Sequence, residues 1–411
     1  MMRKNLRIDG DRLWQSLMRL AEIGATERGG CRRLALSDED KAGRDLFVDW
    51  CKAAGCEIRV DRLGNIFARR RGTDPARAPV ATGSHLDTQP HGGKFDGAYG
   101  VLAGLEVIRT LNEQGIETAA PVEVIAWTNE EGARFAPSMI ASGVFAGSYE
   151  TDFALGCRDN EGRTLGEELE RIGYAGDEPC GEHPLEAFFE AHIEQGPILE
   201  RENKTIGVVT GVQGLRWYDV EVLGQDAHSG STPMEGRRNA LVGSAEMIQA
   251  IDAMALEFAP DAVATVGQLD VSPNSRNTIP GRVNFTVDLR HPDAGVLAEL
   301  DDRLRSTLED IAGIRRLEYS VAQIADTPPV VFDDDCVRAV ANASEALGYS
   351  RRPIRSGAGH DACHVSRVAP TAMIFVPCAD GLSHNEEESA TPDDLEAGCN
   401  VLLHAMLSRA G

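Results

Sequence analysis

The chain has 411 residues, too many for one ordinary compact domain, so two domains are expected. Asp and Glu total 65 against 41 Lys and Arg, and the formal net charge of −24 argues against nucleic acid and anionic membrane as partners, because both repel an acidic surface. Nine cysteines without a CxxC pair, and an N-terminal stretch, MMRKNLRIDGDRLWQSL, without the apolar run of a signal peptide, predict a cytoplasmic enzyme with reduced thiols.

The first half of the chain alternates between helical and strand patterns. Apolar residues recur at helical spacing within 11–55 and again within 100–111. Short apolar segments typical of strands occupy 79–84 and 122–128. This alternation predicts an α/β domain, in which a mostly parallel sheet is flanked by helices and reactive groups lie at the carboxyl ends of the strands.

The pattern changes after about Gly211. Residues 217–223 and 283–289 alternate between apolar and polar side chains, which is typical of a sheet with one buried face. Long helical patterns occupy 239–258 and 294–311. These elements predict a smaller α+β domain.

The parallel-sheet pattern returns near the C-terminus. A buried strand is predicted at 371–378, followed by a last helix at 392–408. We therefore expect a larger domain made of 1–212 and 329–411, with the smaller domain inserted at 213–328.

The first group of reactive side chains follows the strand predicted at 79–84. His85 and Asp87 are two positions apart, so their side chains point the same way, and Asp96 stands in a glycine-flanked turn. An imidazole held by a nearby carboxylate is usual in zinc sites. The alternative is that these residues cap a turn, and the pattern alone leaves both interpretations open.

Two adjacent acids, Glu130 and Glu131, follow the strand predicted at 122–128. One of them could bind a cation while the other accepts a proton from metal-bound water. In a chain this acidic, a solvated acidic turn is an equally good interpretation.

Two further histidines, His192 and His384, each end an apolar run beside a glycine. Singly, each is explained as a structural histidine. Jointly, three histidines and two carboxylates at strand ends of one sheet indicate two metal ions, bridged by Asp96. Mixed nitrogen and oxygen ligation suits zinc, manganese, cobalt or nickel rather than calcium.

Polar groups without a metal role gather in loops. His228 lies in a turn-rich segment, Asn277 precedes an alternating strand, and Arg290 ends that strand. The pair Gly359 and His360 lies in a glycine-rich turn. Each has an ordinary interpretation as a turn, a cap or an ion pair, although the planar fork of an arginine is well suited to a substrate carboxylate.

These residues occur in motifs that appear in the order found in one family: GSHLDTQPHGGKFDG, NEEGARF, AHIEQG, HSGSTPM, NTIPG with VDLRHPD, SGAGHDA and GLSHN. The chain resembles the amidohydrolases that include N-carbamoyl-L-amino acid hydrolase, the dinuclear-metal β-ureidopropionase and allantoate amidohydrolase, among the aminoacylase-like metallopeptidases. The resemblance covers nearly the whole chain. It implies a catalytic α/β domain, an inserted lid domain that dimerises, and hence a homodimer.

The resemblance also implies two divalent metal ions per subunit, zinc first, with manganese, cobalt or nickel as alternatives. His85, Asp96 and His192 would hold one ion. Asp96, Glu131 and His384 would hold the other.

The remaining roles are implied in the same way. Glu130 would be the general base, Asp87 would orient His85, and His228 would stabilise the oxyanion. The residues at substrate-holding positions are Gln195, His228, Asn277, Arg290, Gly359 and His360, with Asn277 and Arg290 on the substrate carboxylate. Many relatives have HAGTTP where this chain has HSGSTP, a difference beside His228 that could tune the substrate accepted.

The expected reaction is hydrolysis of the carbamoyl C–N bond of an N-carbamoyl amino acid, α or β, to amino acid, ammonia and carbon dioxide. The stretches SHLDTQP and WTNEEGARFA look closer to ureido-acid hydrolases than to allantoate enzymes. Allantoate is the alternative substrate, and aminoacylase or exopeptidase activity comes behind it. A non-catalytic binder would have lost Glu130 or a metal ligand, and neither is lost.

Overall fold

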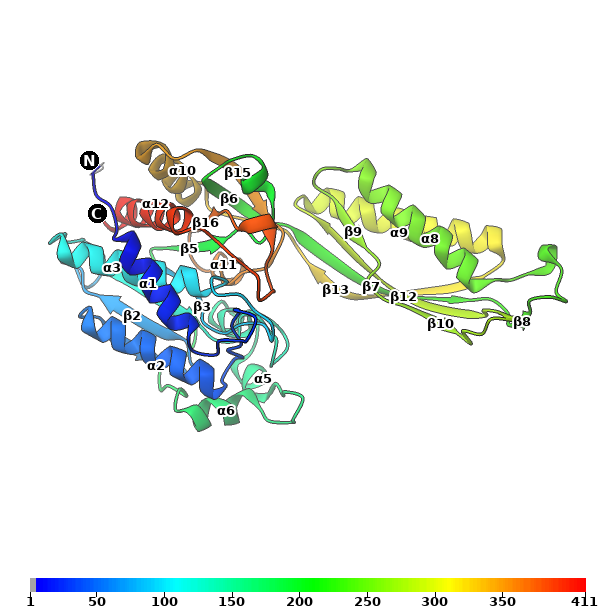
Figure 1. Ribbon diagram of the computed structural model, residues 1–411, viewed down its shortest axis with the longest axis horizontal. Coiled ribbons are helices and arrows are strands. Elements are labelled where there is room, and N and C mark those ends of the chain that lie inside the picture. Colours follow the sequence, from blue (N-terminus) through cyan, green and yellow to red (C-terminus); the bar gives the residue numbers. More distant parts are fainter. Residues whose placement is uncertain (1–4) are drawn as a thin grey trace. The chain divides into compact units, whose positions relative to one another are not determined.

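The computed structural model describes residues 5–411, so residues 1–4, part of the N-terminal stretch used to argue for a cytoplasmic location, lie outside the described residues. The chain forms two compact units (Figure 1). The larger unit runs to Thr210 and resumes at Val331, and the smaller unit is Gly211–Val330. Each unit has its own buried apolar core.

One nine-stranded sheet is centred on the larger unit. Its strands are β1 (Glu57–Val60), β2 (Ile66–Arg70), β3 (Val80–His85), β4 (Val122–Trp127), β5 (Ala187–Ile193), β6 (Ile206–Val212), β14 (Val330–Val331), β15 (Arg351–Ser356) and β16 (Thr371–Val376). The order is β1-β2-β4-β3-β5-β16-β6-β14, with β15 beside β6. The strands β4, β3, β5 and β16 are parallel, and their flanking neighbours β2 and β6 pair antiparallel to them.

Helices flank this sheet and confirm the predicted α/β class. They are α1 (Gly10–Ala21), α2 (Asp38–Ala53), α3 (Ala98–Glu113), α4 (Ile140–Phe145), α5 (Thr151–Gly156), α6 (Leu165–Ile172), α7 (Ile198–Arg201), α10 (Asp334–Leu347), α11 (Asp361–Val365) and α12 (Pro392–Ala410), with a 3₁₀ turn, η2 (Ala379–Gly381). Helices α3 and α12 contact each other, α1 and the central strands (Figure 1). Every residue of β3, β4, β5 and β16 is buried, as expected for strands covered on both faces.

The smaller unit is an antiparallel sheet covered by helices on one face (Figure 1). Its elements are β7 (Gly214–Leu223), β8 (Ala227–His228), η1 (Met234–Gly236), α8 (Ala240–Glu257), β9 (Val263–Thr265), β10 (Leu269–Ser272), β11 (Thr278–Ile279), β12 (Arg282–His291), α9 (Ala294–Arg315) and β13 (Glu318–Thr327). Val283, Phe285, Val287 and Leu289 of β12 are buried, whereas the residues between them are partly exposed. The alternation in the sequence therefore reflects one face packed on helices.

No helix in residues 5–411 is both long and apolar enough to span a bilayer.

Candidate metal centre

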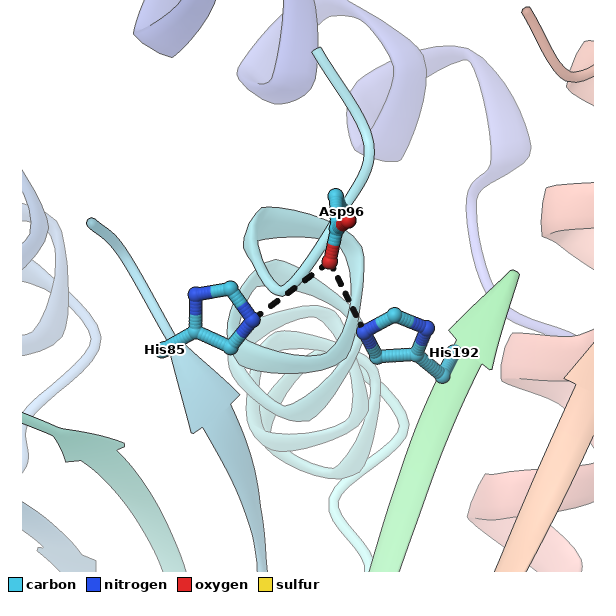
Figure 2. Close-up of side chains that lie close together, drawn as sticks. All are labelled: His85, Asp96 and His192. Carbon is cyan, nitrogen blue, oxygen red and sulfur yellow. Dashed lines mark ion pairs between the residues drawn. The ribbon is translucent and has the colours of Figure 1, made fainter. Parts of the chain in front are cut away.

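Three side chains from separate elements of the larger unit converge at one point (Figure 2). His85 ends β3, His192 lies near the end of β5, and Asp96 precedes α3. Asp96 Oδ1 lies 3.4 Å from His85 Nε2 and 3.2 Å from His192 Nε2. Gly97, with φ of 63°, lies against the His85 ring, where a Cβ would come within 2.4 Å of it, so only glycine fits there.

The other ring nitrogen of each histidine is bonded to a backbone carbonyl. His85 Nδ1 lies 2.8 Å from the Asp87 carbonyl oxygen, and His192 Nδ1 lies 2.9 Å from that of Ile193. Because a carbonyl only accepts, each Nδ1 carries a proton, and each Nε2 is the ring atom that a metal ion could bind. Two imidazole lone pairs and a carboxylate facing one point are a suitable donor set for a divalent cation such as zinc.

The charges around His85 favour a cation as well. Burial lowers the pKa of His85, but the charge of Glu130 and the hydrogen bond of Asp96 outweigh it and raise the pKa well above its usual value. Burial also opposes the charge of Asp96, yet His192 and His85 hold the pKa of that carboxyl well below its usual range. The negative charges that favour a proton on His85 also favour a metal ion in its place, because both are cations.

A second group shares Asp96 through its other oxygen. His384 Nε2 lies 3.4 Å from Asp96 Oδ2 and 3.4 Å from Glu131 Oε2. Gln89 Nε2 donates to Glu131 Oε2 at 2.8 Å. Burial and the charge of Asp96 raise the pKa of Glu131 to about 8, a cost that a bound cation would offset. The structure thus brings the five predicted ligands together in two groups that meet at Asp96.

Asp87 contacts His85 chiefly through its main chain. Its nearer carboxylate oxygen lies 4.0 Å from His85 Nδ1, whereas its backbone carbonyl lies 2.8 Å away and makes the bond. The carboxylate instead accepts from the backbone N–H groups of Glu130 and Glu131, each at 3.3 Å. Asp87 therefore orients His85 through its main chain, and its side chain holds the turn that carries the two acids.

Glu130 lies beside the ligands, with Oε2 3.6 Å from His85 Nε2. Burial, opposed by His85 and assisted by Asp361, raises the pKa of Glu130 well above its usual value. A carboxyl with a raised pKa next to a metal site is suited to taking up and releasing a proton near neutral pH.

Two predicted substrate residues of the larger unit lie against this centre. Gln195 Nε2 donates to Asp96 Oδ2 at 2.9 Å, while its buried Oε1 has no hydrogen-bond partner. The His360 ring centroid lies 4.6 Å from that of His192, and its Nε2 bonds Ser356 Oγ at 3.0 Å. Gly359 precedes His360 and leaves room for Met139, whose Cε would lie 2.8 Å from a Cβ at that position.

Burial, with the charge of His192, lowers the pKa of His360 well below its usual value, so this imidazole is neutral. His360 also belongs to a third group of possible ligands with Glu190 and His192. That group shares His192 with the first one, so the two cannot both use its Nε2.

In the smaller unit, His228 and Asn277 lie close together. His228 in β8 pairs with Thr278 of β11, and Ser229 N donates to the Asn277 carbonyl at 2.9 Å. His228 Nδ1 accepts from the N–H groups of Gly230 and Ser231, at 3.0 and 3.2 Å. The proton of a neutral His228 therefore lies on Nε2, where it can be donated.

Arg290 is separated from them. It is next to last in β12, whereas β11 leads into the first residue of that strand. A strand of ten residues is about 30 Å long. Within one chain, Asn277 and Arg290 are therefore too far apart to hold the same small carboxylate. The Arg290 guanidinium is bonded here to both carboxylate oxygens of Asp288, at 2.8–3.1 Å.

Two residues at the centre were not predicted. Ser383 Oγ lies 2.9 Å from Asp96 Oδ2, and buried Glu388 accepts from the Asp96 backbone N–H at 3.1 Å. Both lie within or just after the GLSHN motif, so their proximity to His384 was the available signal. Their contact with a loop almost 300 positions earlier has no signature in the sequence.

The chain is similar to known proteins over most of its length. Residues 81–408 match Peptidase family M20/M25/M40. The chain is 50% identical over 407 residues to an N-carbamoyl-L-amino-acid amidohydrolase from Rhizobium meliloti, covering 99% of this chain and 98% of that protein. It is 33% identical over 409 residues to a ureidoglycolate hydrolase from Arabidopsis thaliana, covering 97% and 86%. A crystal structure of an amidase of the hydantoinase/carbamoylase family from Burkholderia multivorans is similar with a TM-score of 0.96 at 60% identity, covering 98% of each chain. The resemblance inferred from the motifs is confirmed.

Proposed function

This chain belongs to Peptidase family M20/M25/M40 and is a hydrolase, and from that premise we propose that it hydrolyses the carbamoyl C–N bond of N-carbamoyl amino acids. The observation that carries the proposal is the position of Asp96 between two groups of metal ligands, with Glu130 beside them. The amidohydrolase from Rhizobium meliloti, half identical over nearly the whole chain, supports the substrate class.

The residues fit two divalent ions, held by His85, Asp96 and His192 and by Asp96, Glu131 and His384. When bound, such ions supply a water of lowered pKa and polarise the substrate carbonyl. Zinc suits the mixed nitrogen and oxygen ligands best, with manganese, cobalt and nickel as alternatives.

Glu130 moves the proton. Its carboxylate takes a proton from the attacking water and returns it to the amino nitrogen as the C–N bond breaks. The amino acid leaves, and the remaining carbamate decomposes to ammonia and carbon dioxide. The raised pKa of Glu130 supports this role, because it makes the carboxylate a stronger base toward the attacking water.

Polar groups of the smaller unit complete the site in this proposal. The Nε2 proton of His228 stabilises the developing oxyanion, since Nδ1 is occupied as an acceptor. Arg290 exchanges its bidentate bond with Asp288 for one with the substrate carboxylate, which has the same shape and charge.

We further propose a homodimer in which His228 and Asn277 serve the site of the partner subunit. Within one smaller unit His228 and Arg290 lie at opposite ends of β12, too far apart to hold the same small ureido acid. Strand β13 is an edge of the sheet and carries the exposed side chain of Ile324, 58% accessible. Such an edge is suited to pairing with a second copy.

A substrate panel tests the proposed reaction. Purified protein supplied with zinc or manganese is incubated with N-carbamoyl-α-amino acids, N-carbamoyl-β-alanine, allantoate and ureidoglycolate, and ammonia is measured. We expect the highest kcat/KM on an N-carbamoyl amino acid. Turnover of allantoate or ureidoglycolate with none of the N-carbamoyl compounds would favour the second candidate, to which the plant ureidoglycolate hydrolase points.

A further inference from the structure

A buried carboxylate outside the two ligand groups lies directly behind the shared acid. Glu388 is 4% exposed. Its Oε1 accepts two backbone hydrogen bonds, from Phe95 N at 3.0 Å and from Asp96 N at 3.1 Å. Its Oε2 lies 3.0 Å from Ser383 Oγ. Two backbone donors and one hydroxyl therefore lie within hydrogen-bond distance of this carboxylate and occupy both of its oxygens.

Ser383 connects Glu388 to the side chain of Asp96 as well. Its Oγ lies 2.9 Å from Asp96 Oδ2, so its single hydroxyl hydrogen is within reach of both acids. Gln195 Nε2 donates to Ser383 Oγ at 3.2 Å and to Asp96 Oδ2 at 2.9 Å. These contacts fix which oxygen of Asp96 faces His384.

The contacts of Glu388 join two loops that each supply a ligand. One loop carries Asp96, and the other carries His384 next to Ser383. His384 is 51% exposed at its side chain and has φ of 53°, so burial does little to hold it. The 3.4 Å separation of Asp96 Oδ2 and His384 Nε2 therefore depends on the bonds that tie the loops together.

The chain also leaves room for Glu388. A Cβ built on Gly93 would lie 2.1 Å from the carboxyl carbon of Glu388, far inside contact distance. The second glycine of the GGK segment is thus explained by the approach of this carboxylate.

We propose that Glu388 is a positioning residue of the metal centre, which fixes Asp96 relative to His384 and so forms the second ligand group. This inference rests on the proposed function, because it takes the two groups to be metal sites. Glu388 is not itself a ligand in this account, since its oxygens are taken by the backbone and by Ser383.

Zinc binding tests this role without any substrate. In equilibrium dialysis of metal-depleted protein, we expect two zinc ions for the wild type. In Glu388→Ala we expect one ion to bind as in the wild type. The affinity for the other should fall about 10- to 100-fold, the usual effect of losing a partner that orients a ligand. Glu131→Gln removes a ligand of the His384 group alone, so the zinc ion that it binds more weakly is the ion held by that group.

Asp61→Ala is the matched control. Asp61 is 1% exposed and has the same bonding pattern, with Leu63 N and Asn65 N on one oxygen, at 2.9 and 3.0 Å, and Asn65 Nδ2 on the other at 2.8 Å. It lies in the turn between β1 and β2, outside the ligand groups. We expect it to lower thermal stability as Glu388→Ala does, yet to keep both zinc ions.

Glu388→Gln should retain both ions. Its amide oxygen can accept the two backbone hydrogen bonds, and its Nε2 can donate to Ser383 Oγ, which leaves the hydroxyl hydrogen for Asp96. Unchanged affinity for both ions in Glu388→Ala would overturn the proposal, as would a Gln variant as impaired as the Ala variant.

A second variant tests the proposal if the first does not fold. Should Glu388→Ala fail to fold, Ser383→Ala removes only the side-chain link and should weaken the same ion, and normal binding there would overturn the proposal. A wild type that binds no zinc would contradict the proposed function instead.

Discussion

Glu130 and Glu131 are adjacent in sequence but face different partners. Glu131 Oε2 lies 3.4 Å from His384 Nε2 and accepts from Gln89, which is the setting of a ligand. Glu130 lies beside the first group, with its own pKa raised by burial, which is the setting of a proton carrier. The order of the two acids in the motif does not distinguish the proposed roles, whereas their contacts favour this assignment.

Glu130→Gln should keep metal content and substrate binding while kcat falls by roughly 100-fold or more, the usual scale for a lost general base. Glu131→Gln should lose metal instead, because an amide is a weaker ligand than a carboxylate. Steady-state kinetics and elemental analysis of both proteins check this. Swapped outcomes would mean that the two acids have exchanged roles.

Arg290→Lys should be far from conservative, because an ammonium cannot match both oxygens of a carboxylate with a fixed fork. Substrate affinity should weaken by about 1.5–3 kcal/mol, the scale of a charge-assisted hydrogen bond. Measuring KM for acid substrates and for their amides checks this, since the loss of affinity should be smaller for the amides. Equal losses for acid and amide would assign Arg290 a structural role through Asp288.

At the scale of elements, the strands that position the site could be predicted from sequence. Strands β3, β4 and β16 are buried along their whole length because both faces are covered, and β12 alternates because one face is open. Strand β13 could not be predicted, since it is an exposed edge whose side chains alternate weakly in burial. The apolar pattern of a sequence reflects which side chains are buried, so it does not reveal a strand that buries few of them.

The same limit applies to the site. Ligands at strand ends could be predicted because parallel strands bring their carboxyl ends to one edge. The bonds of Glu388 to the Asp96 loop, and the distance of Arg290 from Asn277, depend on loop contacts and strand length, which short motifs do not contain.

Strand β4 carries a buried acid whose stability contribution depends on pH. Burial opposes the charge of Glu123, but His183 and Arg69, the latter at 2.7 Å, lower the pKa of this carboxyl below its usual value. A carboxyl whose pKa is depressed in the folded state stabilises the protein at pH values above its unfolded pKa of about 4.3. This stabilisation is lost as pH falls through the folded-state pKa.

Glu123→Gln should therefore lower the free energy of unfolding at pH 7 by about 3 kcal/mol, the scale of a broken buried pair. The difference in the free energy of unfolding between variant and wild type should narrow as pH falls below about 4. Urea unfolding of both proteins from pH 7 to pH 3 measures the difference. A difference that stays constant over this range would show that the charge of Glu123 is not what stabilises the fold.

For the whole molecule, the separation of His228 from Arg290 makes assembly a part of the proposed mechanism. Glu130→Gln and His228→Ala are each expected to be inactive, so the two proteins are mixed under subunit exchange. If His228 serves the partner's site, random pairing restores about a quarter of the wild-type sites, because half of the dimers are mixed and each has one intact site. Activity that stays absent, with exchange verified, would place His228 in its own chain, and a monomer by light scattering would exclude the dimer.

In the proposed function, two groups of ligands meeting at Asp96 make this chain a metal-dependent hydrolase of N-carbamoyl amino acids. Ammonia release from the best N-carbamoyl substrate, before and after chelation, tests it most directly. We expect no ammonia release from protein shown by elemental analysis to be metal-free, and recovery when zinc, manganese, cobalt or nickel is returned. Full activity in the metal-free protein would contradict it.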